Sequence, residues 1–216
     1  KPGCECDRFI EVWNLVFTQY DKDENGEYYP LEHPNIDTGM GLERIAAIIE
    51  GAQNIFEIGE IRKILEFVEK VSGKTYGSDS KVDTSIRVIT DHCRAMTFLV
   101  SDGVLPSNEG RGYVLRRLIR RAARHGKLLG IEEIFLNSIV EKVIESWKVE
   151  YPEIEEREEQ IKKVIKAEEE KFEETIHQGI NILENYIENM IKNHEECLNG
   201  EEAFKQIGRA SCRERV

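Results

Sequence analysis

The sequence predicts an α+β protein in which a short antiparallel β-segment precedes an all-helical domain. Strand-like alternation and turn residues are confined to residues 9–37, and from about residue 56 onward apolar residues recur at helical spacing. With 216 residues, 40% of them hydrophobic, the chain is long enough for one full domain and part of another. We expect residues 1–54 to belong to the first domain and residues 55–205 to the helical one.

The first strand is expected over residues 9–20, covered on both faces. Two alternating sets of side chains form these faces: Ile10, Val12, Asn14, Val16 and Thr18 on one, and Trp13, Leu15 and Phe17 on the other. The Asp-Glu-Asn-Gly run at 23–26 supplies a turn, and residues 27–31 are expected to form the returning strand. A short extended piece at 35–37 then leads into a glycine-rich helix start.

Helical spacing follows from residue 42 to a stop near Gly51. Further helices are predicted at 57–71 before Gly73, 83–101 before Gly103, 111–125 before Gly126, and 131–148 before Pro152. Residues 153–191 form a long amphipathic pattern that is more typical of helix packing than of a coiled coil, because strict heptads are not kept. Residues 206–216 break this composition and resemble a cloning or assembly scar.

Composition favours a protein of a reducing cytoplasm with no membrane contact. No stretch approaches the roughly 20 consecutive apolar residues of a membrane span. The five scattered cysteines give no disulfide framework. Cys4 and Cys6 could begin a metal site, but without a second pair an ordinary loop is the better interpretation, so no metal site is predicted.

The net charge of −12 disfavours nucleic-acid binding only until its distribution is considered. Between residues 111 and 127 every charged side chain is basic: Arg111, Arg116, Arg117, Arg120, Arg121, Arg124 and Lys127. Glutamates, in contrast, dominate residues 153–174. An acidic chain of this kind can still carry one basic face.

Residues 37–44, Asp-Thr-Gly-Met-Gly-Leu-Glu-Arg, have the character of a ligand site at the start of a helix. Gly39 and Gly41 allow close approach of a ligand to the backbone, and a helix start favours anions. The Asp37 carboxylate can hold an ammonium group, and the Arg44 fork suits phosphate oxygens. The alternative is structural, with Asp37 as a helix cap and Arg44 in a surface ion pair.

The arginine helix offers a second candidate site. Its apolar face is expected to contain Val114, Leu115, Leu118, Ile119 and Ala122, leaving Arg116, Arg120 and Arg124 in one row and Arg117 and Arg121 in another. Like charges at this spacing repel, so either RNA phosphates or the glutamates of 153–174 should compensate them. In the preceding loop, Asn108 either reads a base edge of an A-form stem or only shapes the turn.

His92 and Cys93 lie together in an apolar helical segment beside Arg94. A Cys/His catalytic pair is the alternative to a structural role. Adjacent helix positions point in different directions and no third orienting group is evident, so the structural interpretation is favoured.

The run at 37–44 resembles motif 3 of the class II aminoacyl-tRNA synthetases, in the form found in the alanyl-tRNA synthetase family. Other segments extend this resemblance: Glu11-Val-Trp-Asn-Leu-Val-Phe17, residues 89–96, residues 101–126 and residues 168–179. The run Leu-Pro-Ser-Asn-Glu-Gly-Arg-Gly-Tyr-Val-Leu-Arg-Arg at 105–117 lies in the most family-specific part. The resemblance covers the chain to about Lys205.

The resemblance implies a role for each candidate residue. Asp37 would hold the amino group of alanine, Asn14, Val16 and Gly39 would shape its pocket, and Arg44, with Gly41, would contact ATP phosphate as the catalytic group. Asn108 would correspond to the family's reader of a G·U pair in the acceptor stem. The expected tRNA-binding residues are Asn108, Arg111, Arg116, Arg117, Arg120, Arg121 and Arg124.

For the intact protein, the resemblance implies ligation of alanine to tRNA(Ala) with ATP and Mg²⁺. Motifs 1 and 2 of the family, and its editing domain with the zinc ligands, are expected to lie outside this sequence, so the chain alone is expected to be inactive. A non-catalytic RNA-binding module derived from the same family is the main alternative. A helical interaction protein without an RNA role is disfavoured by the acid-free arginine stretch.

Overall fold

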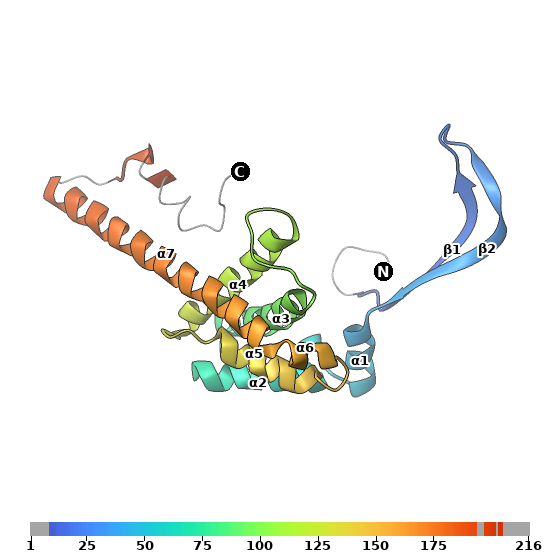
Figure 1. Ribbon diagram of the computed structural model, residues 1–216, viewed down its shortest axis with the longest axis horizontal. Coiled ribbons are helices and arrows are strands. Elements are labelled where there is room, and N and C mark those ends of the chain that lie inside the picture. The colour runs from blue at the N-terminus through green and yellow to red at the C-terminus, as the bar shows by residue number, and fades with distance from the viewer. Residues whose placement is uncertain (1–8, 194–196, 202, 205–216) are drawn as a thin grey trace. The chain divides into compact units, whose positions relative to one another are not determined.

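The computed structural model describes residues 9–193, 197–201, 203 and 204, which fall into two compact units (Figure 1). The first unit comprises residues 1–61 and the second residues 62–216. A β-segment followed by helices is observed, as the sequence predicts. Cys4, Cys6 and the tail at 206–216 lie outside the described residues.

The first unit begins with an antiparallel hairpin of β1 (Trp13–Lys22) and β2 (Tyr28–Met40). Its turn is organised by Asp23, whose Oδ1 accepts hydrogen bonds from the backbone N–H groups of Asn25 at 2.9 Å and Glu27 at 2.8 Å. The returning strand is longer than the predicted 27–31, because it continues through the extended piece at 35–37. An irregularity between Thr18 and Tyr20 shifts the register and lets the long strand stay paired.

The prediction that the first strand is covered on both faces is wrong for the described residues. Trp13 and Phe17 on one face are 60% and 64% exposed, and Val16 on the other is 53% exposed. The alternating apolar sets specified a strand correctly. A two-stranded sheet, however, offers these side chains only each other as neighbours.

A short helical segment follows the hairpin. Helix α1 (Leu42–Glu50) begins after Gly41 and ends at Gly51, whose φ of 68° forms the left-handed stop that the sequence predicts. The 3₁₀ turn η1 (Ile55–Glu57) then brings Ile58 and Ile61 against Ala47, with Phe56 packed beside them. This small cluster is the apolar core of the first unit.

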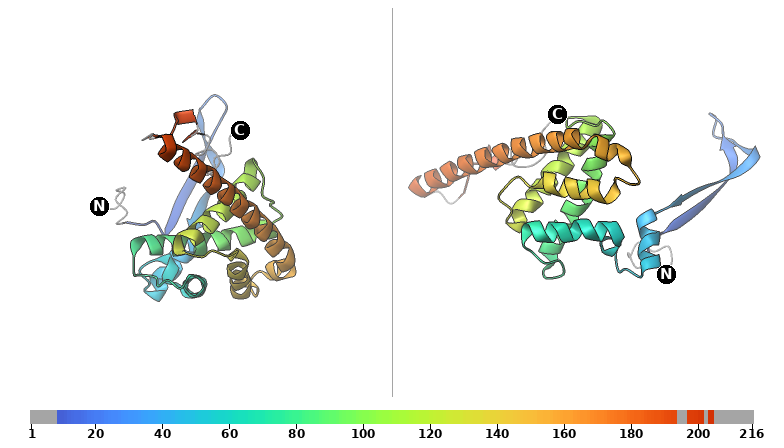
Figure 2. Two further views of the ribbon diagram at one scale, coloured as in Figure 1. Left: turned by 90° about the vertical axis from the view of Figure 1, so that its left-hand side faces the viewer. Right: turned by 60° about the horizontal axis from the view of Figure 1, so that its bottom comes forward.

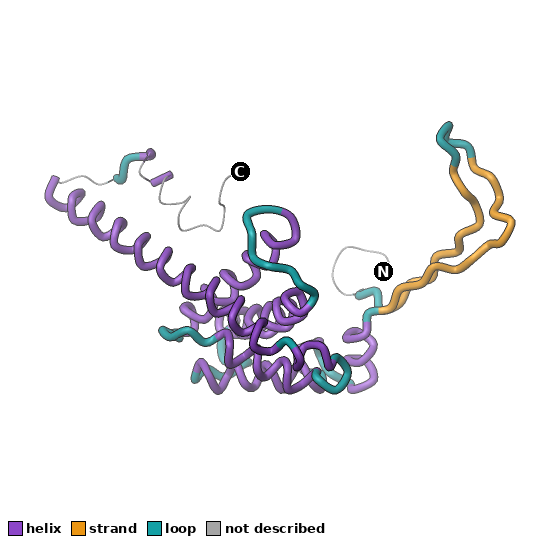
Figure 3. Tube along the Cα trace, in the orientation of Figure 1, coloured by secondary structure: helices purple, strands orange, loops and turns teal. Residues whose placement is uncertain are grey.

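The second unit is a helical bundle. Its elements are α2 (Gly59–Ser72), which belongs to this unit from residue 62 onward, α3 (Ser80–Ser101), α4 (Gly110–Leu129), α5 (Leu136–Trp147), α6 (Pro152–Glu156) and α7 (Glu158–Asn193). Helix α3 packs against α4 and α5, and α7 packs against the same three helices (Figure 2). Figure 3 shows only helices and loops in the described part of this unit.

The core of the bundle is aliphatic. Its fully buried side chains include Ile64, Leu65, Ile86, Ile89, Met96, Leu115, Ile119, Leu136, Ile139, Ile154, Ile161 and Ile165. Helix α7 contributes buried residues only as far as Phe172, and its remaining turns extend beyond the bundle (Figure 1). None of the helices in the described part of the chain has the length and apolar character needed to cross a membrane.

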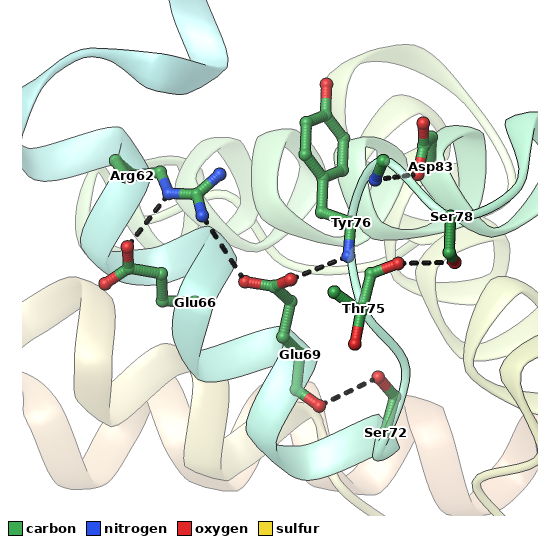
Figure 4. Close-up of polar contacts among 9 residues, drawn as sticks. Arg62, Glu66, Glu69, Ser72, Thr75, Tyr76, Ser78 and Asp83 are labelled. Carbon is green, nitrogen blue, oxygen red and sulfur yellow. Dashed lines mark hydrogen bonds and ion pairs between the residues drawn. The ribbon is translucent and has the colours of Figure 1, made fainter.

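The connection from α2 to α3 is held by polar contacts with the backbone (Figure 4). A Glu69 carboxylate oxygen accepts from the N–H of Tyr76 at 2.6 Å, while the other lies 3.7 Å from Arg62. Asp83, in the first turn of α3, accepts from the N–H of Gly77 at 2.7 Å. These contacts satisfy loop N–H groups and anchor the start of α3.

Gly126 does not end α4, contrary to the prediction. The helix continues to Leu129 and stops at Gly130, whose φ is 89°. Gly126 serves packing, because a Cβ there would lie 2.2 Å from the Phe135 ring. The next helix, α5, starts at Leu136 and not at the predicted residue 131. The single helix predicted over 153–191 is divided into α6 and α7 at Arg157, whose guanidinium donates to the Ser101 carbonyl.

Candidate functional site

One face of the hairpin collects the four residues expected to surround alanine. In the pairing register Asn14 lies opposite Gly39 and Val16 opposite Asp37, and directly opposed residues project to the same face. The Gly39 N–H donates to Asn14 Oδ1 at 3.1 Å, and Asn14 Nδ2 donates to Glu11 Oε1 at 3.0 Å. The Asn14 side chain is therefore held in place, and the exposed Asp37 carboxylate stands next to it along β2.

Arg44 lies on the first turn of α1, directly after this face. Its Nη1 donates to the Glu11 carbonyl, and the N–H of Gly41 donates to the carbonyl of Val12 at 2.9 Å. A Cβ at Gly41 would lie 3.1 Å from Arg44 Cδ, so glycine leaves room for the arginine stem. The structure thus places the segment 37–44 next to β1 and to residues 11 and 12 within the first unit.

The buried face of α4 is rotated from the predicted one. Leu115, Ile119 and Ala122 are buried as expected, but Val114 is 52% exposed and Leu118 is only partly buried. Arg116 and Arg120 take the inward positions instead, with 8% and 6% exposure. The sequence did not reveal this rotation, because both the arginines and the apolar residues of α4 recur at helical spacing and either set could face inward.

The two inward arginines share one carboxylate on α7. Glu168 Oε1 lies 3.1 Å from Arg116 Nε and 2.7 Å from Arg120 Nε, and Glu168 is 8% exposed. The Arg120 guanidinium also lies over the Phe172 ring, 5.4 Å from its centroid. The expectation that Arg116 and Arg120 present their charges to RNA does not agree with this geometry, which matches the alternative of pairing with the glutamates of 153–174.

The other arginines of α4 face solvent. Arg111, Arg117, Arg121 and Arg124 are exposed. A groove of about 560 Å³ is lined by three of them together with His92, Val114, Leu118, Arg120, His125, Leu128 and Phe172. Val114 and Leu128 are 52% and 65% exposed, so this face combines positive charge with apolar side chains. Such a combination suits a ligand with phosphates and flat apolar surfaces.

His125 lies among the arginines that line this groove. Partial burial, together with the charges of Arg121 and Arg124, lowers the pKa of His125 below its usual value. His125 Nδ1 lies 3.0 Å from Ser85 Oγ. The ring is therefore mainly neutral near pH 7, and the positive potential of the groove comes from the arginines.

The structural interpretation of His92 and Cys93 agrees with their surroundings. Cys93 is fully buried, and burial raises the pKa of its thiol well above its usual value, which disfavours the reactive thiolate. His92 Nδ1 lies 2.9 Å from Asp91 Oδ2, and hydrogen bonding to His92 lowers the pKa of Asp91. Arg94 lies over the Trp147 ring, 6.0 Å from its centroid.

Sequence reasoning missed the individual role of Glu168. The glutamates of 153–174 were considered only as a group, although Glu168 is buried and Glu170 is exposed. A useful signal would have been its spacing from Ile161, Ile165 and Phe172. This spacing places Glu168 on the buried stripe of α7.

The comparisons with known proteins identify the family of the chain. The family model described as tRNA synthetases class II (A) matches residues 1–207. The chain belongs to this class II tRNA synthetase family. It is 59% identical over 208 residues to the alanine–tRNA ligase of Acetivibrio thermocellus, and 60% identical over 205 residues to that of Clostridioides difficile.

The matched segments cover 96% and 95% of this chain but only 24% and 23% of the two ligases. The chain therefore spans about a quarter of the length of the curated relatives it matches. As a class II tRNA synthetase segment, it contributes a hairpin, a helix start and a helical bundle. Among the residues that the structure describes, no group of three or more His, Cys, Asp or Glu side chains is placed to hold a metal ion.

Proposed function

We propose that this chain is the segment of a cytoplasmic alanine–tRNA ligase that completes the alanine and ATP site and binds the acceptor stem of tRNA(Ala). The observation that carries the RNA-binding part is the division of α4. Arg116 and Arg120 are neutralised by Glu168, whereas Arg117, Arg121 and Arg124 have no carboxylate within ion-pair distance in the described part of the chain. Unpaired exposed arginines beside apolar groups favour a phosphate ligand.

In the first unit, the proposed ligands are alanine and ATP. The Asp37 carboxylate would attract the ammonium group of alanine, while Asn14, Val16 and Gly39, on the same face, would lie beside its methyl group. Arg44 and the N–H groups at the start of α1 suit ATP phosphate oxygens, because a planar fork and a helix N-terminus both favour anions. Mg²⁺ would accompany ATP, and we assign it no ligand among the described residues.

Adenylate formation and transfer need positioned charge more than a protein nucleophile. In this proposal Arg44 binds phosphate while Asp37 orients the alanine amino group, so that the alanine carboxylate can attack the α-phosphorus and displace pyrophosphate. The exposed arginines of α4 would then hold the acceptor stem through its phosphates. Asn108, in the loop before α4, would contact a base edge of the G·U pair.

The RNA-binding proposal is tested by measuring the affinity of the chain for tRNA(Ala) transcript across a salt series. The double variant Arg117→Ala/Arg121→Ala should weaken binding and reduce the slope of log affinity against log salt by about 0.7–0.9 per lost phosphate contact. The matched control, Lys163→Ala/Lys166→Ala, removes the same charge from exposed positions of α7. It should change the affinity and the salt slope less than the arginine double variant does. Equal behaviour of the two double variants would contradict the proposed surface.

A further inference from the structure

The loop that carries Asn108 is held closely against the first turn of α4. A Cβ at Gly112 would lie 2.3 Å from both the Leu105 carbonyl oxygen and Ser107 Oγ, so only glycine permits this approach. Ser107 Oγ in turn donates to the Glu109 carbonyl at 2.8 Å. The backbone around Asn108 is thus fixed independently of the Asn108 side chain.

The orientation of the Asn108 amide is decided by Arg116. Arg116 Nη1 donates to Asn108 Oδ1. A guanidinium has only donors, so the carbonyl end of the amide must face it and the Nδ2 group must point elsewhere. The Nδ2 hydrogens are then the donors that Asn108, which is exposed as a residue, can offer to a base-edge acceptor.

Arg116 is fixed by α7. Its Nε lies 3.1 Å from Glu168 Oε1 inside the bundle, where both residues are 8% exposed. The guanidinium therefore uses two different nitrogens, one for Glu168 and one for Asn108, and its planar geometry transmits the position of one partner to the other. Arg120 shares the same Glu168 oxygen at 2.7 Å, but no contact between Arg120 and Asn108 occurs in the described structure.

We propose that Arg116 and Glu168 are positioning residues for tRNA selection: Glu168 orients the Arg116 guanidinium, which turns the Asn108 amide so that its Nδ2 donates to the acceptor-stem base pair. The inference rests on the proposed reading of that pair by Asn108. It assigns Arg116 to specificity and not to the phosphate contacts of the exposed arginines. Arg120 becomes a structural partner of the same carboxylate.

The test uses the full-length ligase that carries this sequence, with kcat/KM for aminoacylation measured on tRNA(Ala) containing a G·U or a G·C pair in the acceptor stem. Arg116→Lys keeps the charge, but one ammonium group cannot reproduce two contacts made by separate nitrogens. It should lower the G·U preference by roughly 5- to 150-fold, the range expected when one good base contact is lost. Asn108→Ala should lower it similarly, and the double variant should lose no more than Asn108→Ala alone.

Arg120→Lys is the matched control, because Arg120 is equally buried and shares Glu168 but does not reach Asn108. Both lysine variants should lower the melting temperature, whereas only Arg116→Lys should lower the G·U preference. As a second variant, Glu168→Gln should lower the preference while Glu170→Gln, at an exposed position of α7, should not. Glu168→Gln serves in place of Arg116→Lys where the latter fails to fold.

Two outcomes would overturn the positioning role while leaving the proposed function intact. One is that Asn108→Ala loses the G·U preference but Arg116→Lys and Glu168→Gln keep it. The other is that Arg120→Lys loses the preference as fully as Arg116→Lys, which would reveal a general packing effect. Retention of the preference in Asn108→Ala would instead overturn the proposed base reading by Asn108, and the positioning role with it.

Discussion

At the scale of single residues, the hairpin site depends on where charge is placed. Asp37 is the carboxylate on the face that also carries Asn14, Val16 and Gly39, because the register opposes these residues in pairs. The Asn14 side chain is already engaged with Gly39 and Glu11. Asp37 is exposed, so its charge is available to a ligand.

Asp37→Asn in the full-length ligase should raise the KM for alanine by roughly 10- to 150-fold, because a hydrogen bond to a charged group contributes about 1.5–3 kcal/mol. The change keeps the size of the side chain and removes its charge. Alanine-dependent pyrophosphate exchange across an alanine series measures the effect. Asp21→Asn, at an exposed position of the same hairpin, is the control, and a shared response of both variants would remove Asp37 from the alanine site.

The arginine row illustrates what residue identity can and cannot predict. The acid-free run of arginines was visible in the sequence, and so was the possibility that glutamates of 153–174 compensate it. Which arginines turn inward depends on the rotation of α4 against α7, a long-range property. The local helical pattern allows either Val114 or Arg116 to face inward. Arg116 does so in the structure, where it pairs with Glu168, which lies 52 residues away in the sequence.

At the scale of secondary-structure elements, two glycines inside helices have different roles. Gly126 lies inside α4, where the Phe135 ring occupies the space a side chain would need. Gly179 lies inside α7, where a Cβ would meet nothing within 4 Å. The sequence predicted a helix end at the first of these, since a glycine after an apolar pattern usually marks one, and the packing partner could not be read locally.

Gly126→Ala should therefore destabilise the bundle by about 1–3 kcal/mol, the usual cost of forcing extra volume into a packed core. Gly179→Ala should instead stabilise the chain, raising the free energy of unfolding by up to about 1 kcal/mol, because alanine is the better helix former. Urea unfolding midpoints of the two variants measure the difference. A destabilisation of equal size in both would show that Phe135 is not the reason for glycine at 126.

The start of α5 is capped by a buried acid from another helix. Glu169 on α7 is 3% exposed, and its carboxylate accepts from the backbone N–H groups of Phe135 at 3.1 Å and Leu136 at 3.2 Å. Burial raises the pKa of Glu169 from 4.5 to about 7, with these backbone hydrogen bonds acting in the opposite direction. The folded chain thus keeps a proton that the unfolded chain releases between these two values.

Because the folded state binds the extra proton between pH 4.5 and about 7, the contribution of Glu169 to stability falls as the pH rises through that window. Glu169→Gln, which is neutral at every pH, should therefore have a higher melting temperature than the unchanged chain at pH 8. This difference in melting temperature should disappear toward pH 5. The shift should be on the order of 10 °C, since the raised pKa corresponds to roughly 3 kcal/mol at pH 8 and each 1 kcal/mol changes the melting temperature of a domain this size by about 2–4 °C. Glu170→Gln should show no such pH dependence, and a constant offset for Glu169→Gln would contradict the raised pKa.

At the scale of the whole molecule, the two units differ in how much they bury. The second unit encloses a mainly aliphatic core to which α2 to α7 each contribute buried residues. The first has a small cluster around Ala47 and a hairpin with both faces exposed. The order of elements was predictable because periodicity is local, whereas the exposure of the hairpin was not, because the same alternation describes a strand in a large sheet.

The 216-residue chain by itself should bind tRNA(Ala) but show no alanine-dependent pyrophosphate exchange. An isolated two-stranded hairpin is marginally stable in water, so the backbone that carries Asp37 and Asn14 would not be held rigidly enough to stabilise a transition state. Hydrogen exchange should accordingly be slow for core amides of α3 and α4, and much faster for amides of β1 and β2. The exposed arginines of α4 rest on the protected bundle, so their affinity for RNA should survive in the same sample. Pyrophosphate exchange above that of Arg44→Ala, or equal protection of backbone amides in the two units, would contradict this separation of the proposed alanine site from the proposed RNA-binding surface.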